Sequence, residues 1–172
     1  DDLLGELAAV PGVYVPSLYD PAPPAGRGLV FVRPRGGAPP VVRKRVLRSF
    51  ARSPFPADIV VPSLQAVFDR VAVEVARGCP HKCRFCQAAS LYAPYRVKDP
   101  DFVAAKVFES CRLTGYEDAS LFSLSVGDYP YLGETIKGLM SGLERDRISL
   151  SLSSLRPKGL STEIVRGIAQ VR

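Results

Sequence analysis

Strand-like and helix-like patterns of apolar residues follow one another through the second half of the chain. Val71 to Val75 is rich in β-branched residues and alternates as a half-buried strand does. Further strands are expected over Ala119 to Val126 and Ile148 to Leu155, and helices over 99 to 114, over 131 to 143 and from Ser161 onward. Strands that alternate with helices predict an α/β fold with a parallel sheet or barrel.

The segment over 99 to 114 carries the clearest signals for the two ends of a helix. Asp99 can accept a hydrogen bond from the free backbone amides of a first turn, and Pro100 suits the first helical position. Gly115 suits the left-handed residue that ends a helix. Cys111 lies on the apolar stripe of this helix, which predicts a small buried hydrophobe.

Proline dominates the first third of the chain. Eleven of the sixteen prolines precede residue 63, and each removes a backbone hydrogen-bond donor. We therefore divide the chain into a Pro-rich extended linker or cap over residues 1–62 and a core over residues 63–172. Within the linker, a short helix is expected over Leu3 to Val10, and Leu29 to Arg33 is expected to pair with Val41 to Leu47 as a hairpin.

Composition narrows the class of protein. Hydrophobic residues make up 47% and charged residues 23%, which are values typical of globular domains. No run approaches the roughly 18 to 20 apolar residues that span a bilayer. The acidic start Asp1-Asp2 lacks the basic region of a signal peptide. We expect a cytoplasmic protein with no membrane partner.

Basic residues gather between positions 27 and 52. The net charge is +6, and this basic arm holds eight Lys or Arg residues with no acidic residue. They are Arg27, Arg33, Arg35, Arg43, Lys44, Arg45, Arg48 and Arg52. One interpretation is an arm that contacts the phosphates of a nucleic acid such as RNA. The other is a solvated basic face, or a face that docks on an acidic domain outside this chain.

Three of the four cysteines follow the first strand of the core at C-x3-C-x2-C spacing, at Cys79, Cys83 and Cys86. This clustering favours metal binding in a reducing compartment over a disulfide framework. Three thiolates can each bind a different iron of a 4Fe-4S cluster and leave the fourth iron open. A structural zinc site that also uses His81 is the alternative, and Cys111 is a second candidate for a fourth ligand.

The cysteine motif resembles that of the radical SAM superfamily. The three cysteines match the cluster ligands of that family, and Phe85 matches the aromatic residue that lies near the adenine of S-adenosylmethionine. The stretches Val73 to Cys79 and Cys86 to Ala88 look like the branch that carries an N-terminal cobalamin-binding domain. Pro11 to Ser17 is similar to the junction that follows that domain.

The resemblance implies a 4Fe-4S protein that reductively cleaves S-adenosylmethionine to a 5′-deoxyadenosyl radical, which abstracts hydrogen from a substrate. It implies a partial (βα) barrel with about three of the six βα units of that family. The remaining half of the barrel, any cobalamin domain and a reductant such as flavodoxin or ferredoxin are then expected partners outside this chain. We expect the chain by itself to bind the cluster poorly.

The resemblance also assigns residues to the cofactor. In a βα barrel, ligands collect at the carboxyl ends of the strands. The segment Ser125 to Asp128 stands where the family carries a Gly-Gly-Glu-like segment, so Ser125, Gly127 and Asp128 are assigned to S-adenosylmethionine. Arg156, after the third strand, is assigned to the same site. The alternative for Asp128 is a turn or cap residue.

Serines recur on one face of two strands: Ser123 and Ser125 of the second, and Ser149, Ser151 and Ser153 of the third. If the apolar face packs on helices, the serines line the lumen of the barrel on the substrate side. Glu74 would point into the same lumen and pair with Arg156. The alternatives are an apolar lumen with the serines under the helices, and a surface position for Glu74.

Two other classes of function compete with a radical SAM enzyme. The first is a non-catalytic iron-sulfur module for electron transfer or structure, although a ferredoxin-like carrier uses a fourth cysteine that the motif lacks. The second is a nucleic-acid-binding protein that uses the basic arm, for which affinity would fall steeply with salt.

Overall fold

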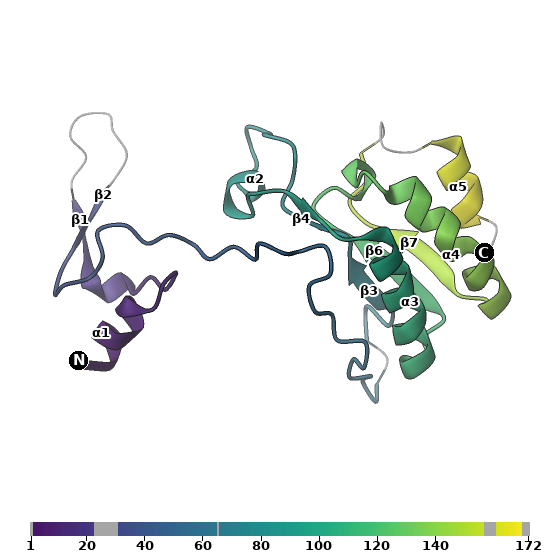
Figure 1. Cartoon of the computed structure of the whole chain (residues 1–172), viewed down its shortest axis with the longest axis horizontal. Helices are drawn as coiled ribbons and strands as arrows, with labels where there is room; N and C mark the ends of the chain where they lie inside the picture. The colour runs from purple at the N-terminus through teal and green to yellow at the C-terminus, as the bar shows by residue number, and fades with distance from the viewer. Residues whose placement is uncertain (1, 23–30, 65, 157–160, 170–172) are drawn as a thin grey trace. The chain divides into compact units, whose positions relative to one another are not determined.

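The structure is a computed structural model that describes residues 2–22, 31–64, 66–156 and 161–169. Two compact units divide the chain, Asp1–Arg48 and Ser49–Arg172, and each is described by itself (Figure 1). The division lies ahead of the boundary after residue 62 that the prolines suggest. Phe50, Ser53 and Ala57 are buried in the second unit, which is why the segment after Arg48 belongs to the core.

The first unit contains α1 (Asp2–Ala9), the 3-10 helix η1 (Pro16–Leu18) and an antiparallel pair of strands, β1 (Tyr19–Ala22) and β2 (Phe31–Pro34). The short N-terminal helix is confirmed. The predicted hairpin between 29–33 and 41–47 is wrong, because β2 pairs with the preceding strand β1 and residues 41–47 form no strand. The hydroxyl of Tyr19 donates to the carbonyl of Pro39 at 2.8 Å.

The second unit is built on a parallel sheet in the order β3-β6-β7. Its strands are β3 (Val71–Glu74), β6 (Asp118–Phe122) and β7 (Ser149–Leu152), and its main helices are α3 (Pro100–Thr114), α4 (Leu132–Asp146) and α5 (Thr162–Ala169). Figure 1 shows α3 beside α4. The alternation of strands and helices confirms the predicted α/β class with a parallel sheet.

The ends of α3 follow the predicted signals. A carboxylate oxygen of Asp99 accepts from the backbone N–H of Phe102 at 2.9 Å, and Pro100 opens the helix. Gly115 adopts a φ of 75°, and its N–H donates to the carbonyl of Cys111 at 2.8 Å. These capping bonds satisfy backbone groups that a helix end leaves free.

The core lies between one face of the sheet and the helices. Val73 of β3 pairs in register with Leu121 of β6, which pairs with Leu152 of β7. Val73 and Leu121 are fully buried, as are Val107 of α3 and Leu139 of α4. Burial of side chains of this size stabilises by about 1.5 to 3 kcal/mol each. The sheet positions that alternate with these residues form the opposite face.

The predicted serine face is right for β7 and wrong for the end of β6. Ile148, just before β7, and Leu150 are buried, whereas the alternating Ser149 and Ser151 are half-buried. After β6, however, Ser123 and Ser125 are only 9% and 4% exposed, whereas Phe122 and Leu124 are exposed. Burial keeps alternating past the end of the strand, and Ser123 and Ser125 share the buried side of Leu121. The prediction took Phe122 and Leu124 as the packed residues, but Leu121 is the one that enters the core. The chain then turns into the 3-10 helix η2 (Val126–Asp128).

A small antiparallel ladder stands beside the main sheet and was not predicted. It joins β4 (Ala76–Arg77) to β5 (Arg96–Val97). The chain between them contains the cysteine loop, defined as residues 79–86, and the short helix α2 (Ala88–Leu91). In the described part of the chain, no helix has the length and apolar character needed to cross a membrane.

Phe50 anchors the start of the second unit. The Phe50 ring is 3% exposed, and cationic groups of Arg77, Arg96 and Lys98 lie 5.0, 5.5 and 4.7 Å from its centroid. The ammonium of Lys98 donates to the carbonyl of Ser53 at 3.0 Å and to its hydroxyl at 2.6 Å. Burial lowers the pKa of Lys98. These contacts hold residues 50–53 on the core.

Phe50→Leu is expected to lower the free energy of unfolding by about 1 to 2 kcal/mol. The smaller side chain leaves part of the site unfilled, and the attraction of the three cations for the ring is lost. Urea unfolding followed by circular dichroism measures the change. Phe68 is 77% exposed, so Phe68→Leu serves as the control and should stay within about 0.5 kcal/mol of the parent. Equal effects in the two variants would contradict the anchoring role of Phe50.

Candidate functional site

The cysteine loop leaves β4 and ends just before α2. All three of its cysteines are free thiols; Cys79 is half-buried, and Cys83 and Cys86 are exposed. The backbone N–H of Cys86 donates to the carbonyl of Cys83 at 3.0 Å, which forms a tight turn between these two residues. Among the described residues, no three His, Cys, Asp or Glu side chains are grouped to hold a metal ion.

Cys111 lies apart from the loop, in the last turn of α3. Its side chain is 4% exposed and belongs to the core between sheet and helices. Burial raises the pKa of this thiol to about 11. A buried thiol of this kind behaves as a small hydrophobe, as its place on the apolar stripe predicts.

Gly78 lies at the base of the segment that carries the cysteines, where the chain that leaves β4 passes the chain that returns to β5. It has a φ of +93°, a conformation that side chains with a Cβ rarely adopt. A Cβ at this position would lie 2.8 Å from the carbonyl oxygen of Tyr92 and 3.0 Å from that of Pro94. The outgoing and returning chains therefore pass so close that only glycine fits between them. This contact, with the β4–β5 ladder, closes the base of the segment.

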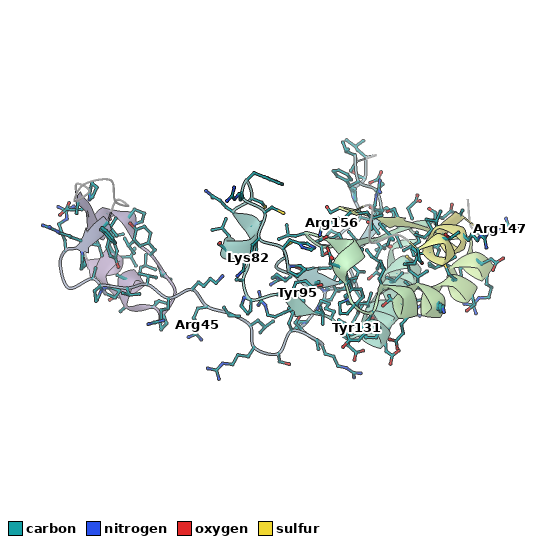
Figure 2. The ribbon with its side chains drawn as sticks, turned by 90° about the horizontal axis from the view of Figure 1, so that it is seen from above. Arg45, Lys82, Tyr95, Tyr131, Arg147 and Arg156 are labelled. Carbon is teal, nitrogen blue, oxygen red and sulfur yellow. The ribbon has the colours of Figure 1, made fainter. Side chains whose placement is uncertain are left out.

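Asp128 is the centre of a polar cluster at the carboxyl ends of the strands. Its carboxylate oxygen Oδ2 accepts from the hydroxyl of Ser125 at 2.6 Å and lies 2.7 Å from Nε2 of His81. The hydroxyl of Tyr95 donates to the backbone carbonyl of Asp128 at 3.0 Å. Nη1 of Arg156 lies 3.0 Å from Nδ1 of His81. Figure 2 labels Tyr95 and Arg156 among the side chains of the second unit. The structure thus brings together Ser125, Asp128 and Arg156, which the sequence assigns to one site.

Charge within this cluster follows from its hydrogen bonds. The hydroxyl of Ser125 and the imidazole of His81, with the positive charge of Arg156, lower the pKa of Asp128 against the opposing effect of burial. Burial, and then the negative charges of Asp128 and Cys79, raise the pKa of Tyr95 to about 12. At neutral pH, Asp128 is therefore a carboxylate acceptor and Tyr95 remains a phenol that donates.

We expect Asp128 to contribute to acid stability. A carboxyl group whose pKa is lower in the folded state stabilises the fold above its unfolded pKa, and this contribution is lost as pH falls through the folded value. The stability of the parent chain should therefore fall more steeply below about pH 4 than that of Asp128→Asn. Urea unfolding between pH 2.5 and 6 measures both. Parallel pH curves would show that Asp128 makes no such contribution.

Other residues assigned to the site lie elsewhere. Glu74 does not pair with Arg156; both of its carboxylate oxygens bind the guanidinium of Arg77, with Oε1 2.9 Å from Nε. Arg77 lies only three positions further along the chain, in β4, and both carboxylate oxygens of Glu74 are used by this local pair. Gly127 lies within η2, next to Asp128. The Phe85 ring is 90% exposed in the cysteine loop.

The serines of β7 bond mainly to the neighbouring strand. The hydroxyl of Ser149 contacts the carboxylate of Asp118, and the hydroxyl of Ser151 donates to the carbonyl of Ala119 at 3.3 Å. The hydroxyl of Ser153 lies 3.5 Å from the carbonyl of Leu121, at the limit of a hydrogen bond. These serines add contacts between β6 and the chain of β7, and they remain half-buried.

A hollow of about 200 Å³ lies beside the base of the cysteine segment. It is lined by Glu74, Ala76, Arg77, Gly78, Tyr92, Phe122, Ser123 and Leu124. Most of these side chains are apolar, and the Glu74–Arg77 pair adds a charged edge. The hollow therefore offers a small, mostly apolar binding surface at the ends of β3 and β6.

No protein-family model matches this chain. The chain is 34% identical over 94 residues to a protein of Methanocaldococcus jannaschii described as "Uncharacterized protein MJ0966". The matched part is 55% of this chain and 20% of that protein. The chain thus spans about a fifth of the length of this relative, whose description states no activity.

The residues of the basic arm are divided between the two units. Arg35 of the first unit pairs with Asp20 at 3.2 Å, and Arg52 of the second unit lies 3.7 Å from Asp99. Arg27 lies outside the described residues. At least two cations of the arm thus have acidic partners within the chain, which fits local ion pairing as well as it fits a phosphate-binding surface.

Proposed function

We propose that this chain is a Pro-rich linker followed by the N-terminal half of a radical SAM core, in which Cys79, Cys83 and Cys86 hold a 4Fe-4S cluster. One observation carries the proposal. A loop with three free thiols follows the first strand of a parallel sheet and is tied by His81 to Asp128 and Arg156, which follow the next two strands. Convergence of loops at the carboxyl ends of parallel strands is where α/β proteins place their ligands.

The chemistry of the cysteine loop fits an iron-sulfur cluster. Cys83 and Cys86 are exposed on a turn, and Cys79 is a free thiol at the start of the same loop. Thiolates are the usual ligands of such clusters, and three of them leave one iron of a 4Fe-4S cluster open. When bound, the cluster would supply an electron that cleaves S-adenosylmethionine and yields a 5′-deoxyadenosyl radical.

The polar cluster at Asp128 supplies groups of both charges for the cofactor. The carboxylate of Asp128, oriented by Ser125, would accept from the amino group of S-adenosylmethionine. The guanidinium of Arg156 would bind the carboxylate of the same molecule. Gly127 would let the backbone of η2 approach the cofactor, and the exposed ring of Phe85 is available to stack on the adenine.

The substrate would lie on the face of the sheet opposite the helices. This face carries Ser149, Ser151 and Ser153, and the hollow beside Glu74 opens near it. As part of the same proposal, the remaining strands of the barrel come from sequence outside this chain, and cobalamin would bind only on a further domain. The electron would come from a reductant such as flavodoxin or ferredoxin.

Product analysis tests the proposed function. The full-length protein, loaded with iron and sulfide without oxygen and reduced with dithionite, is incubated with S-adenosylmethionine. We expect 5′-deoxyadenosine and methionine in equal amounts. Cys86→Ala is the control and should form neither product. A protein that holds its full cluster and forms no 5′-deoxyadenosine would instead be the non-catalytic iron-sulfur module.

A further inference from the structure

His81 connects the cysteine loop to two other parts of the fold. Asp128 is a carboxylate and can only accept, so we assign the proton to Nε2 of His81, which donates to Oδ2 across 2.7 Å. Nη1 of Arg156 contacts the same ring, 3.0 Å from Nδ1 and 2.5 Å from Nε2. These two distances place the guanidinium against the ring and not in line with the lone pair of Nδ1, so the hydrogen bond of the ring is the one to Asp128. The His81 ring thus lies between the carboxylate of Asp128 and the guanidinium of Arg156.

Asp128, which accepts the hydrogen bond from His81, is also bound by other residues. The hydroxyl of Ser125 binds the same carboxylate oxygen at 2.6 Å, and Tyr95 binds the backbone carbonyl of Asp128 at 3.0 Å. Asp128 is 29% exposed at its side chain and His81 31%, so the contact is partly shielded from water. A hydrogen bond to a charged group in this setting contributes more than one on an open surface.

Several other side chains of the cysteine loop are exposed and do not pack on the core. Cys83, Phe85 and Cys86 are exposed, and Gly78 fixes only the base of the segment. His81 lies between the first two cysteines. Within the described ranges, its side chain connects the loop to Asp128, which follows β6, and to Arg156, which follows β7.

We propose that His81 is a positioning residue that fixes the cysteine loop against Asp128 and Arg156. Its consequence for cofactor binding rests on the proposed function, because the loop would then hold the cluster at a set position beside the groups that bind S-adenosylmethionine. The contact itself does not depend on that function.

The first test uses the chain without a cluster. His81 is the single histidine of the chain, so labelling with ¹⁵N-histidine gives the signals of one ring. We expect the proton on Nε2, held by Asp128, to exchange slowly with water, and to exchange fast in Asp128→Ala. Asp146→Ala is the matched control, because it removes an exposed carboxylate that pairs with Arg145 at 2.8 Å. A proton on Nε2 that exchanges as fast in the parent chain as in Asp128→Ala would overturn the proposal.

Limited trypsin digestion measures the loop directly, since Lys82 and Arg84 are cleavage sites within it. In His81→Ala, cleavage at these two sites should be about ten-fold faster, because the loop loses its hydrogen bond to the carboxylate of Asp128. Cleavage after Lys106 in α3 gives the internal reference. His81→Gln keeps a side-chain donor and should restore most of the protection. Unchanged cleavage in His81→Ala would overturn the proposal.

A third test uses the full-length protein that carries its iron-sulfur cluster. His81→Ala should keep the iron content of the parent, while the concentration of S-adenosylmethionine that half-converts the electron paramagnetic resonance signal rises about ten-fold. His81→Gln should lie near the parent. Equal concentrations in all three would overturn the positioning role. If the parent holds no cluster, the proposed function fails, and the nuclear magnetic resonance and trypsin results still decide whether His81 fixes the loop.

Discussion

Cys83→Ala in the full-length protein is expected to abolish assembly of the iron-sulfur cluster, so that iron falls from about four atoms per chain to near zero. Cys83 is the middle one of the three cysteines, and its thiol is exposed. Its backbone carbonyl accepts from the N–H of Cys86 at 3.0 Å, so the two residues share one turn. Two remaining thiolates cannot hold a four-iron cluster against solvent. Iron and sulfide analysis after reconstitution without oxygen measures the loss.

Cys111→Ala is the matched control for this experiment. Cys111 is 4% exposed in the core of the second unit. Its replacement should leave the iron content unchanged and lower the free energy of unfolding by about 1 kcal/mol, because it removes one small buried side chain. Equal loss of iron in the two variants would overturn the assignment of the three cluster ligands.

Gly78→Ala is expected to destabilise the second unit by about 2 to 5 kcal/mol and to reduce cluster loading. The positive φ costs about 1 to 2 kcal/mol for any residue with a Cβ. A further 1 to 3 kcal/mol, approximately, comes from overpacking, because the added atom would lie 2.8 and 3.0 Å from two backbone oxygens. Backbone cannot move aside without breaking the β4–β5 ladder. Urea unfolding and iron analysis measure the two effects.

Gly115→Ala separates the two causes. Gly115 has a φ of +75° and no atom within 4 Å of an added Cβ. It should therefore show the cost of the positive φ alone, about 1 to 2 kcal/mol, with normal iron content. If Gly78→Ala costs no more than Gly115→Ala and binds iron normally, the close approach at Gly78 is not needed to form the loop.

Local signals predict the parts of the fold that depend on neighbouring residues. Asp99 and Gly115 bound α3 as expected, since capping is decided by a few adjacent residues. The alternation of Leu150 with serines also places β7 correctly. The hairpin of the first unit failed because strand pairing depends on which segments meet, and β2 meets β1. The prediction for Ser123 and Ser125 failed because they share the buried side of Leu121, and the adjacent apolar pair Leu121-Phe122 does not tell which of its two residues enters the core.

The candidate site was predictable only in part, because its contacts also join residues that lie far apart in the sequence. Strand order places Asp128 and Arg156 at one edge, and the structure brings them near the cysteine loop. His81 and Tyr95 were not assigned to the cluster, because their partners lie 47 and 33 positions away in the sequence. A histidine inside a cysteine motif, followed by an acidic residue after the next strand, is the signal that could have suggested the contact.

The most direct test of the radical SAM proposal is electron paramagnetic resonance of the reduced, reconstituted full-length protein with and without S-adenosylmethionine. An iron that no protein ligand occupies is open to the cofactor, whereas a cluster with four protein ligands is not. We expect about four irons per chain and a signal that changes shape when S-adenosylmethionine is added. A four-iron cluster with a signal that the cofactor leaves unchanged would contradict the proposal.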